Sequence, residues 1–455
     1  MPLKNKRILP AQLIPISFLS AVIVGTVFLI LPVSTAAGET TDILTALFTA
    51  TTSVCVTGLV VVDTYAHWSP FGQLVILLLI QIGGLGIITV ASMFMLLGKQ
   101  KFYLRDRILL GESLNVSTKR GLLRFLIHIF EGVLIVETIG AVVYSTKFVP
   151  LLGWPRGLWV SVFQSVSAFC NAGMDVFGPN SLIDLRDSSL VMWSTMILII
   201  LGGLGFVVWF DLIDGIRSGI KNRFSPGMIL RRLSEHSRIV LILTAVLILS
   251  GAACILTAEY NNPGTIGNLR LSQKILNSLF QSVTFRTAGF ASVPQENLTD
   301  YSCLIGYILM FIGGSPVGTA GGIKTVTAFL FFMNAVSYIR GEKENVLFHR
   351  RVPEEQMKKA SAIVFVSLTA VLIMASLLML CGGISQTDAL YEIVSALGTV
   401  GLSRGLTPNL DTAGRIIIII SMFLGRIGPI SMAVLFTKKE PKNMIKHAEG
   451  TFYVG

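Results

Sequence analysis

Charged residues are scarce in this chain. Only 13% of its 455 residues are Asp, Glu, Lys or Arg, while 53% are apolar and the mean hydropathy is +0.74. Soluble domains carry about a quarter charged residues, so this composition excludes an ordinary soluble protein. The sequence predicts an all-α polytopic membrane protein instead.

The marks of an enzyme are also missing. The five cysteines lie mostly in apolar runs, at spacings that fit neither a metal site nor a disulfide framework. The five histidines are scattered, and no paired catalytic carboxylates or serine nucleophile motif is present. In the glycine-rich stretch 313–322, Ile323 separates the last glycine from Lys324, whereas a nucleotide-binding loop needs Gly-Lys-Ser/Thr. We therefore expect neither catalysis nor an organic cofactor.

Long apolar runs, by contrast, are plentiful. At about 20 residues per crossing, eight of them could span a bilayer. They cover residues 9–33, 71–98, 122–146, 189–213, 239–259, 302–339, 361–382 and 414–437.

The positive charge is concentrated between these runs. Of the 36 Lys and Arg, 26 fall in five stretches that share one side of the membrane if the spans alternate. These stretches are 1–8, 99–124, 217–238, 340–359 and 438–446. Since positive residues stay cytoplasmic, we expect both termini to be cytoplasmic. The net charge of +11 then needs no nucleic acid to explain it.

One short pattern recurs four times at nearly even spacing. Each copy has an amphipathic run, then small or hydroxyl residues, then one glycine. The glycines are Gly58, Gly173, Gly289 and Gly401, separated by 115, 116 and 112 residues. Such a period indicates internal repeats. We expect repeat 1 at 1–98, repeat 2 at 99–220, repeat 3 at 221–340 and repeat 4 at 341–437, followed by a cytoplasmic tail at 438–455.

Each repeat is expected to contain an outer helix, a half-helix, a glycine loop and an inner helix. The half-helices are predicted at 42–53, 158–168, 272–284 and 387–397. They are too short to cross a bilayer, and backbone that re-enters a membrane is tolerated only where it is buried in protein or lines water. Four glycine loops around one axis would form a ring of carbonyls that replaces the hydration shell of a cation.

A second pattern lies in the inner helices: IGGLG at 82–86, LGGLG at 201–205, IGGSPVG at 312–318 and LGRIG at 424–428. Small residues allow close helix packing in membranes, which is the simpler interpretation for the first two copies. The third copy lies in the run 302–339, which would be roughly 57 Å long as one helix. Its glycines and Pro316 predict two half-helices joined by a loop.

In the fourth copy, Arg426 replaces the central glycine. An arginine within a membrane span is costly, and it is functional by default. The position is near mid-membrane, because eleven residues separate it from Thr437 at the basic end. We therefore expect a functional role for Arg426 rather than a place at the interface.

Taken together, these motifs resemble the TrkH/KtrB/HKT superfamily of potassium transport proteins. The resemblance is carried by VCVTG at 54–58, FCNAGMD at 169–175, FRTAGF at 285–290 and GTVGLS at 398–403, with the break at 313–322 and Arg426. It covers essentially the whole chain and is nearest to KtrB, the membrane subunits of bacterial Ktr uptake systems. It implies potassium uptake through a pseudo-fourfold pore in a bacterial plasma membrane.

The resemblance also assigns roles to residues. The filter carbonyls would belong to Val56, Thr57, Gly58, Asn171, Ala172, Gly173, Thr287, Ala288, Gly289, Thr399, Val400 and Gly401. The gating residues would be Gly313, Gly314, Ser315, Pro316, Gly318, Thr319, Gly321, Gly322 and Lys324, with Arg426 facing the loop. Some sodium-preferring plant relatives have serine at the first filter glycine, so glycine at all four positions favours potassium.

Two charged residues near the loops carry separate expectations. Arg286 would repel cations if it faced the path, so we expect it to point away and to pair with a carboxylate such as Glu392. For Asp175, two interpretations stay open: a carboxylate that concentrates cations at the outer mouth, or a solvated residue of the rim.

The resemblance further implies a homodimer in membrane lipid and a cytosolic ring of KtrA-like, nucleotide-binding regulatory subunits. Potassium is the expected cargo, and sodium is often linked to transport in this family. A sodium-coupled secondary transporter, or a sodium-translocating relative, stays open as the alternative. Secondary transporters usually show inverted two-part repeats, whereas all four repeats here have the same orientation.

Overall fold

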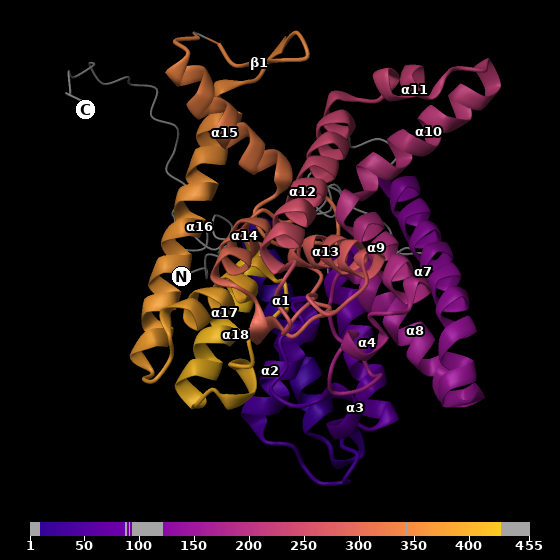
Figure 1. The fold of residues 1–455 in the computed structure, drawn as a ribbon, viewed down its shortest axis with the longest axis vertical. Coiled ribbons are helices and arrows are strands. Elements are labelled where there is room, and N and C mark those ends of the chain that lie inside the picture. The colour runs from indigo at the N-terminus through magenta and orange to yellow at the C-terminus, as the bar shows by residue number, and fades with distance from the viewer. Residues whose placement is uncertain (1–9, 87–88, 91, 93–121, 343, 429–455) are drawn as a thin grey trace, which may run out of the picture.

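The computed structural model describes residues 10–86, 89–90, 92, 122–342 and 344–428. Within them, one order of helices recurs four times: a long outer helix, a short helix and an inner helix (Figure 1). The expected ends of spans two and eight, the basic segment 99–120 and the tail at 438–455 lie largely or wholly outside the described residues.

The four outer helices are long and apolar enough to cross a membrane. They are α1 (Pro10–Ile30), α7 (Leu122–Leu152), α12 (Glu235–Glu259) and α16 (Glu354–Leu380). Each leaves a row of large apolar side chains uncovered, such as Leu134, Leu249 and Phe365, which are 60%, 64% and 72% exposed. Such continuous apolar surface fits a lipid environment.

The four short helices lie at the predicted half-helices. They are α2 (Ile43–Val54), α8 (Trp154–Cys170), α13 (Leu271–Phe285) and α17 (Gln386–Gly398). Side-chain caps fix where two of them begin: Asp42 accepts the N–H groups of Leu44 and Thr45, and Ser385 accepts that of Asp388. Unlike the outer helices, these helices are largely buried.

The inner helices are shorter than expected. They are α4 (Pro70–Leu85), α9 (Ser189–Leu204), α14 (Asp300–Phe311) and α18 (Thr412–Ile427). Three of them end at a glycine with φ near +87°, namely Gly86, Gly205 and Gly428. Glycine adopts such a conformation without steric cost. An α-helix needs a negative φ, so the helix ends where this conformation occurs.

The second inner helix therefore corrects our expectation of a continuous span at 189–213. After Gly205 the chain turns by 100° into α10 (Phe206–Asn222). The third inner helix breaks as predicted: α14 ends at Phe311, a loop follows, and α15 (Thr325–Ile339) begins afterwards. The smaller elements are α3 (Thr64–His67), α11 (Pro226–Arg232), four 3-10 turns and the antiparallel strands β1 (Val346–Leu347) and β2 (Arg350–Arg351).

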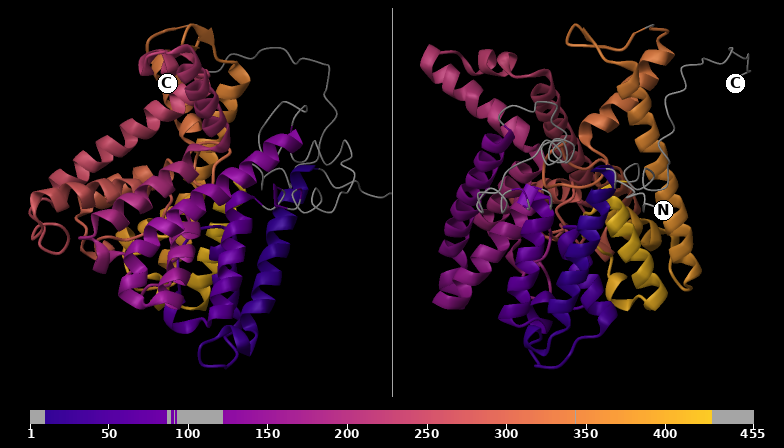
Figure 2. Two further views of the ribbon diagram at one scale, coloured as in Figure 1. Left: turned by 90° about the vertical axis from the view of Figure 1, so that its right-hand side faces the viewer. Right: turned by 180° about the vertical axis from the view of Figure 1, so that it is seen from behind.

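The two ends of the molecule differ in shape. Helices α10, α11 and α15 and the β1–β2 hairpin project from one end, whereas α2 and α3 lie at the opposite end (Figures 1 and 2). The projecting end carries many of the arginines, including Arg223, Arg231, Arg232, Arg350 and Arg351. Its charge agrees with the positive side expected from the sequence.

Candidate ion path

The four glycine loops share one backbone conformation. In each loop the glycine has a positive φ, and so does the residue two positions before it. The earlier residues are Val56, Asn171, Thr287 and Thr399, with φ of 54°, 60°, 65° and 49°. Positive φ is uncommon outside glycine and exceptional for β-branched residues. Strained backbone of this kind persists only where its surroundings hold it, and it clusters at functional sites.

The glycines of the four loops form a closed ring. A Cβ atom added at any of them would collide with the carbonyl oxygen of the middle residue in the next loop. The pairs are Gly58 with Ala172, Gly173 with Ala288, Gly289 with Val400 and Gly401 with Thr57. At Gly289 the separation would be only 2.5 Å. The sequence of contacts runs in chain order and returns from the fourth loop to the first.

The hydroxyl residues before each loop hold it in place. In the first and fourth loops, the hydroxyls of Thr52 and Ser395 accept the N–H of Gly58 and Gly401 at 3.0 and 3.1 Å. The part that these two hydroxyls play in holding the loops was not predicted from the sequence. The hydroxyl-rich stretch in each copy of the repeat is the sequence feature that could have predicted these bonds.

In the second and third loops the equivalent hydroxyls act as hydrogen-bond donors and not as acceptors. Ser167 donates to the carbonyl of Met174 at 2.5 Å, and Thr284 donates to the carbonyl of Phe290 at 2.7 Å. In all four loops the N–H of the middle residue donates to a carbonyl in the last turn of the short helix. Each loop is thus bonded to its own helix.

The first glycine of the inner-helix pattern supports the short helices. A Cβ at Gly83, Gly202 or Gly425 would strike a carbonyl oxygen in the last turn of the neighbouring short helix. Those carbonyls belong to Val54, Phe169 and Leu397. Close packing is therefore the role of these glycines, and it presses each inner helix against the base of a loop.

The loop between α14 and α15, residues 312–324, closes on itself. The N–H of Gly313 donates to the carbonyl of Ile323 at 3.0 Å, and the N–H of Ile323 donates to the carbonyl of Phe311 at 3.1 Å. These bonds replace part of the helical hydrogen bonding lost at the break. The loop is thus an ordered element and not an open connection.

The 312–324 loop also binds the break in the second inner helix. The N–H groups of Ser315 and Thr319 donate to the carbonyls of Gly203 and Gly202 at 2.9 and 3.1 Å, and the N–H of Phe206 donates to the carbonyl of Val317 at 3.0 Å. The break at Gly205 frees backbone groups that the loop then uses. The LGGLG pattern predicted only close helix packing, and the docking of the 312–324 loop on it was not predicted.

The same loop touches the glycine loops. The hydroxyl of Thr319 lies 3.0 Å from the carbonyl oxygen of Phe169 and 3.3 Å from Oδ1 of Asn171. Gly321 lies against Thr399, since a Cβ there would collide with the threonine hydroxyl. The 312–324 loop is therefore in contact with both the second and the fourth glycine loops.

Arg426 joins two elements through carbonyl oxygens. Its Nη1 donates to the carbonyl of Thr319 at 2.7 Å, and its Nη2 donates to that of Gly83 at 2.5 Å. Among the described residues, no carboxylate forms a salt bridge with it. The guanidinium thus ties the 312–324 loop to the end of α4 while keeping its positive charge.

The expected pairing of Arg286 with Glu392 is wrong. Arg286 is buried and donates from Nη2 to the carbonyl of Gly313 at 3.3 Å, so it braces the third glycine loop against the 312–324 loop. Glu392 instead accepts a bond from the hydroxyl of Thr407. The partner of Arg286 is thus a backbone carbonyl freed by the broken helix, and not a carboxylate.

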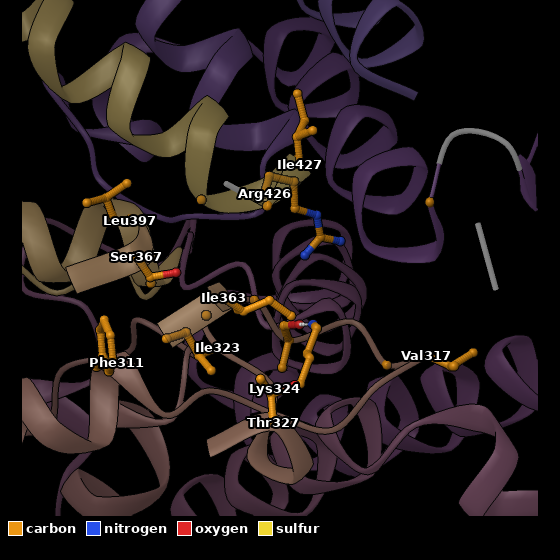
Figure 3. Close-up of a pocket in the computed structure, with 18 of the residues that line it drawn as sticks. Phe311, Val317, Ile323, Lys324, Thr327, Ile363, Ser367, Leu397, Arg426 and Ile427 are labelled. Atoms are coloured by element: carbon orange, nitrogen blue, oxygen red, sulfur yellow. Dashed lines mark hydrogen bonds between the residues drawn. The ribbon is translucent and has the colours of Figure 1, made fainter. Parts of the chain in front are cut away.

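A cavity of about 470 Å³ lies next to the 312–324 loop. The ends of α4 and α18 and parts of α1, α16 and α17 contribute to its walls. In Figure 3 the side chain of Arg426 extends toward the cavity from α18, and that of Lys324 from the 312–324 loop. Lys324 donates to the carbonyl of Ala320 at 2.6 Å. Two cationic groups that hold the loop therefore also face open space.

The chain has clear relatives. The family model TrkH, described as a cation transport protein, matches residues 16–448. The Ktr system potassium uptake protein B of Bacillus subtilis is 37% identical over 453 residues, which cover 100% of this chain and 98% of that protein. The potassium/sodium uptake protein NtpJ of Enterococcus hirae is 36% identical over 437 residues, covering 95% and 93%.

The fold has a solved counterpart as well. The crystal structure of the potassium transporter TrkH from Vibrio parahaemolyticus matches with a TM-score of 0.74, covering 96% of this chain and 87% of that one. At 15% identity, this likeness concerns the fold alone.

Proposed function

The chain belongs to the TrkH family of cation transport proteins, and we propose that it is a potassium uptake protein in which the four glycine loops form the filter of the ion path. The observation that carries the assignment is the closed ring, in which every filter glycine abuts a carbonyl of the next loop. Carbonyl oxygens crowded around one axis can replace the water of a dehydrated cation. The potassium/sodium and potassium uptake names of two full-length relatives support the cargo.

The filter sites are the carbonyls of the three residues in each loop. They are Val56, Thr57, Gly58, Asn171, Ala172, Gly173, Thr287, Ala288, Gly289, Thr399, Val400 and Gly401. Alternating positive φ at the first and third residues supports this assignment, because it lets successive carbonyls point the same way. Side chains need not match for such a ring to form.

The gate is the loop 313–322 together with Lys324 and Arg426. The loop lies between the filter and the cavity, and Arg426 holds it through the carbonyl of Thr319. An unpaired guanidinium in the path would also repel cations. Movement of the loop away from Arg426 would open the path.

The membrane arrangement follows from the same repeats. With eight spans, both termini would lie in the cytoplasm of a bacterial cell, and the basic end with α10, α11 and the hairpin would face inward, because positive residues stay cytoplasmic. Two copies form a dimer. A cytosolic ring of nucleotide-binding subunits, as the family resemblance implies, docks on the basic end, and the name of the Bacillus subtilis relative as part of a Ktr system supports such a partner.

Sodium-linked transport is the second candidate. The relative in Enterococcus hirae is named a potassium/sodium uptake protein. In that case sodium would enter with potassium or stimulate its uptake. The sequence resemblance to both relatives is nearly equal in identity, so the choice rests on a flux measurement.

The test is uptake of labelled rubidium into proteoliposomes, with and without sodium. The natural chain should take up rubidium, and Gly401→Ala should lose about tenfold or more, because the methyl group meets the carbonyl of Thr57 and adds strain at a φ of 96°. Gly405→Ala is the matched control, with a φ of 86° and open space around it. Equal uptake by both variants would refute the filter.

A further inference from the structure

The cavity below the gate has an unexpected charge for a cation path. Its cationic side chains are Lys324, Lys359 and Arg426, and none of the described residues that line it is acidic. Walls of one sign attract the opposite ion and exclude the like one. Three positive groups with no carboxylate therefore favour an anion, and they oppose the passage of potassium.

Most of the other side chains in the lining are apolar. They include Ile14 and Phe18 of α1 and Ile363 and Val371 of α16, whereas two threonines and one serine are the uncharged polar side chains among the described lining residues. Both α1 and α16 are outer helices with uncovered apolar faces. A volume of about 470 Å³ is within the range of sites for small molecules. The site thus suits a molecule with an anionic head and an apolar body.

Two of the three cationic groups that line this cavity also hold the gate. Arg426 bonds the carbonyl of Thr319 at 2.7 Å, and Lys324 bonds that of Ala320 at 2.6 Å. Both acceptors are neutral, and hydrogen bonds to an ionised oxygen are roughly twice as strong. An anion that enters the cavity would therefore compete with the loop for both groups.

We propose that this cavity binds the phosphate group of an anionic phospholipid from the surrounding membrane, and that the bound lipid opens the gate. The phosphate takes Arg426 and Lys324 away from the loop carbonyls, while its charge offsets the barrier to cations. Lys359, exposed near the start of α16, guides the headgroup from the cytoplasmic surface. The proposal rests on the gate assigned above, and it adds the ligand that controls it.

Proteoliposomes test the proposal. The full chain is reconstituted in phosphatidylcholine alone, in phosphatidylcholine mixed with phosphatidylglycerol, and in phosphatidylcholine with inorganic phosphate in the buffer. We expect phosphatidylglycerol to raise rubidium uptake severalfold and inorganic phosphate to leave it unchanged. An equal response to inorganic phosphate would overturn the lipid assignment, because a free anion would then suffice.

Two neighbouring lysines provide the matched variants. Lys359 lines the cavity, whereas Lys358 is exposed and pairs with Glu354 at 2.8 Å. Lys359→Gln should need about fivefold more phosphatidylglycerol for the same stimulation, since one basic residue near a membrane contributes that much to lipid binding. Lys358→Gln should respond like the natural chain. If both variants respond alike, general surface charge explains the effect and the site is refuted.

Binding can also be measured without transport. Native mass spectrometry of the purified chain should show retained phosphatidylglycerol, and less of it in Lys359→Gln than in Lys358→Gln. Retention that is equal in the two variants would contradict the site. Rubidium uptake in phosphatidylcholine alone distinguishes a failure of the lipid proposal from a failure of the proposed potassium function. If the chain takes up rubidium there and added phosphatidylglycerol does not change the rate, the lipid gate is refuted and the potassium function stands.

Discussion

The second and third inner helices both break at the recurring glycine pattern, yet they break in different ways. After α9, one glycine turns the chain by 100° and a helix resumes at once, whereas α14 and α15 are separated by the 312–324 loop. The backbone groups freed by the short break bind those of the long one, through Gly202, Gly203 and Phe206. The break in one repeat thus serves as the dock for the loop that we propose as the gate in the next.

The largest expected effect comes from blocking this dock. In Gly205→Ala the added methyl group would collide with the carbonyl of Pro316, so the loop could not settle against α9. We expect uptake to become constitutive, at a rate tenfold or more above that of the closed natural chain. The reason is that the clash destabilises the docked loop by more than about 1.4 kcal/mol. The measurement is rubidium uptake with the regulatory partner absent.

Gly86→Ala is the control for Gly205→Ala. Gly86 has a φ of 86°, nearly that of Gly205, but among the described residues the nearest neighbour of an added methyl group would be the Thr89 hydroxyl at 3.6 Å. Both substitutions add the same backbone strain, and only one of them meets the loop. If Gly86→Ala is equally open, backbone strain explains the result and the comparison of the two breaks fails.

An intermediate effect is expected at Arg426. Arg426→Gln removes the charge and weakens the bonds to Thr319 and Gly83, so potassium flux should rise severalfold. Its effect should not add to that of a deletion within 315–320, because both changes release the same contact. Strictly additive increases would show that the arginine and the loop act separately.

The smallest effect should follow Thr319→Val. It removes one hydroxyl between the gate and the second filter loop, worth about 1 kcal/mol, so uptake should change by no more than about fivefold. Because Asn171 loses a neighbour, the preference for potassium over sodium should fall as well. Thr327→Val, in the cavity wall, is the control, and a selectivity change there of equal size would count against a link between gate and filter.

The sequence predicted the repeat pattern but not the ways in which its parts meet. The four short helices could be predicted because each is an amphipathic run that directly precedes one of the evenly spaced glycines. Such a run is recognisable from neighbouring residues alone. The positive φ of Val56, Thr287 and Thr399 could not be foreseen, because β-branched residues usually avoid it and only the surrounding fold imposes it. The role of Gly205 was hidden for a different reason: a glycine that ends a helix looks the same in sequence as one that packs it.

Long-range partners were equally out of reach. Arg286 needed an acceptor, and the sequence offered carboxylates such as Glu392, but the fold supplied the carbonyl of Gly313. Such carbonyls become available only where a helix breaks, and the geometry of the break decides which way they point. The broken third helix itself was predicted, because a 38-residue run with Pro316 at its centre is too long to be one crossing.

The ring of four loops is built from a single polypeptide, and this has a genetic consequence. In a ring of four identical subunits, every substitution appears four times, so a change that suits one position is imposed on all. Here one codon alters one quarter of the ring. The 312–324 loop in the third quarter and Arg426 in the fourth can therefore coexist with a glycine in each of the four glycine loops.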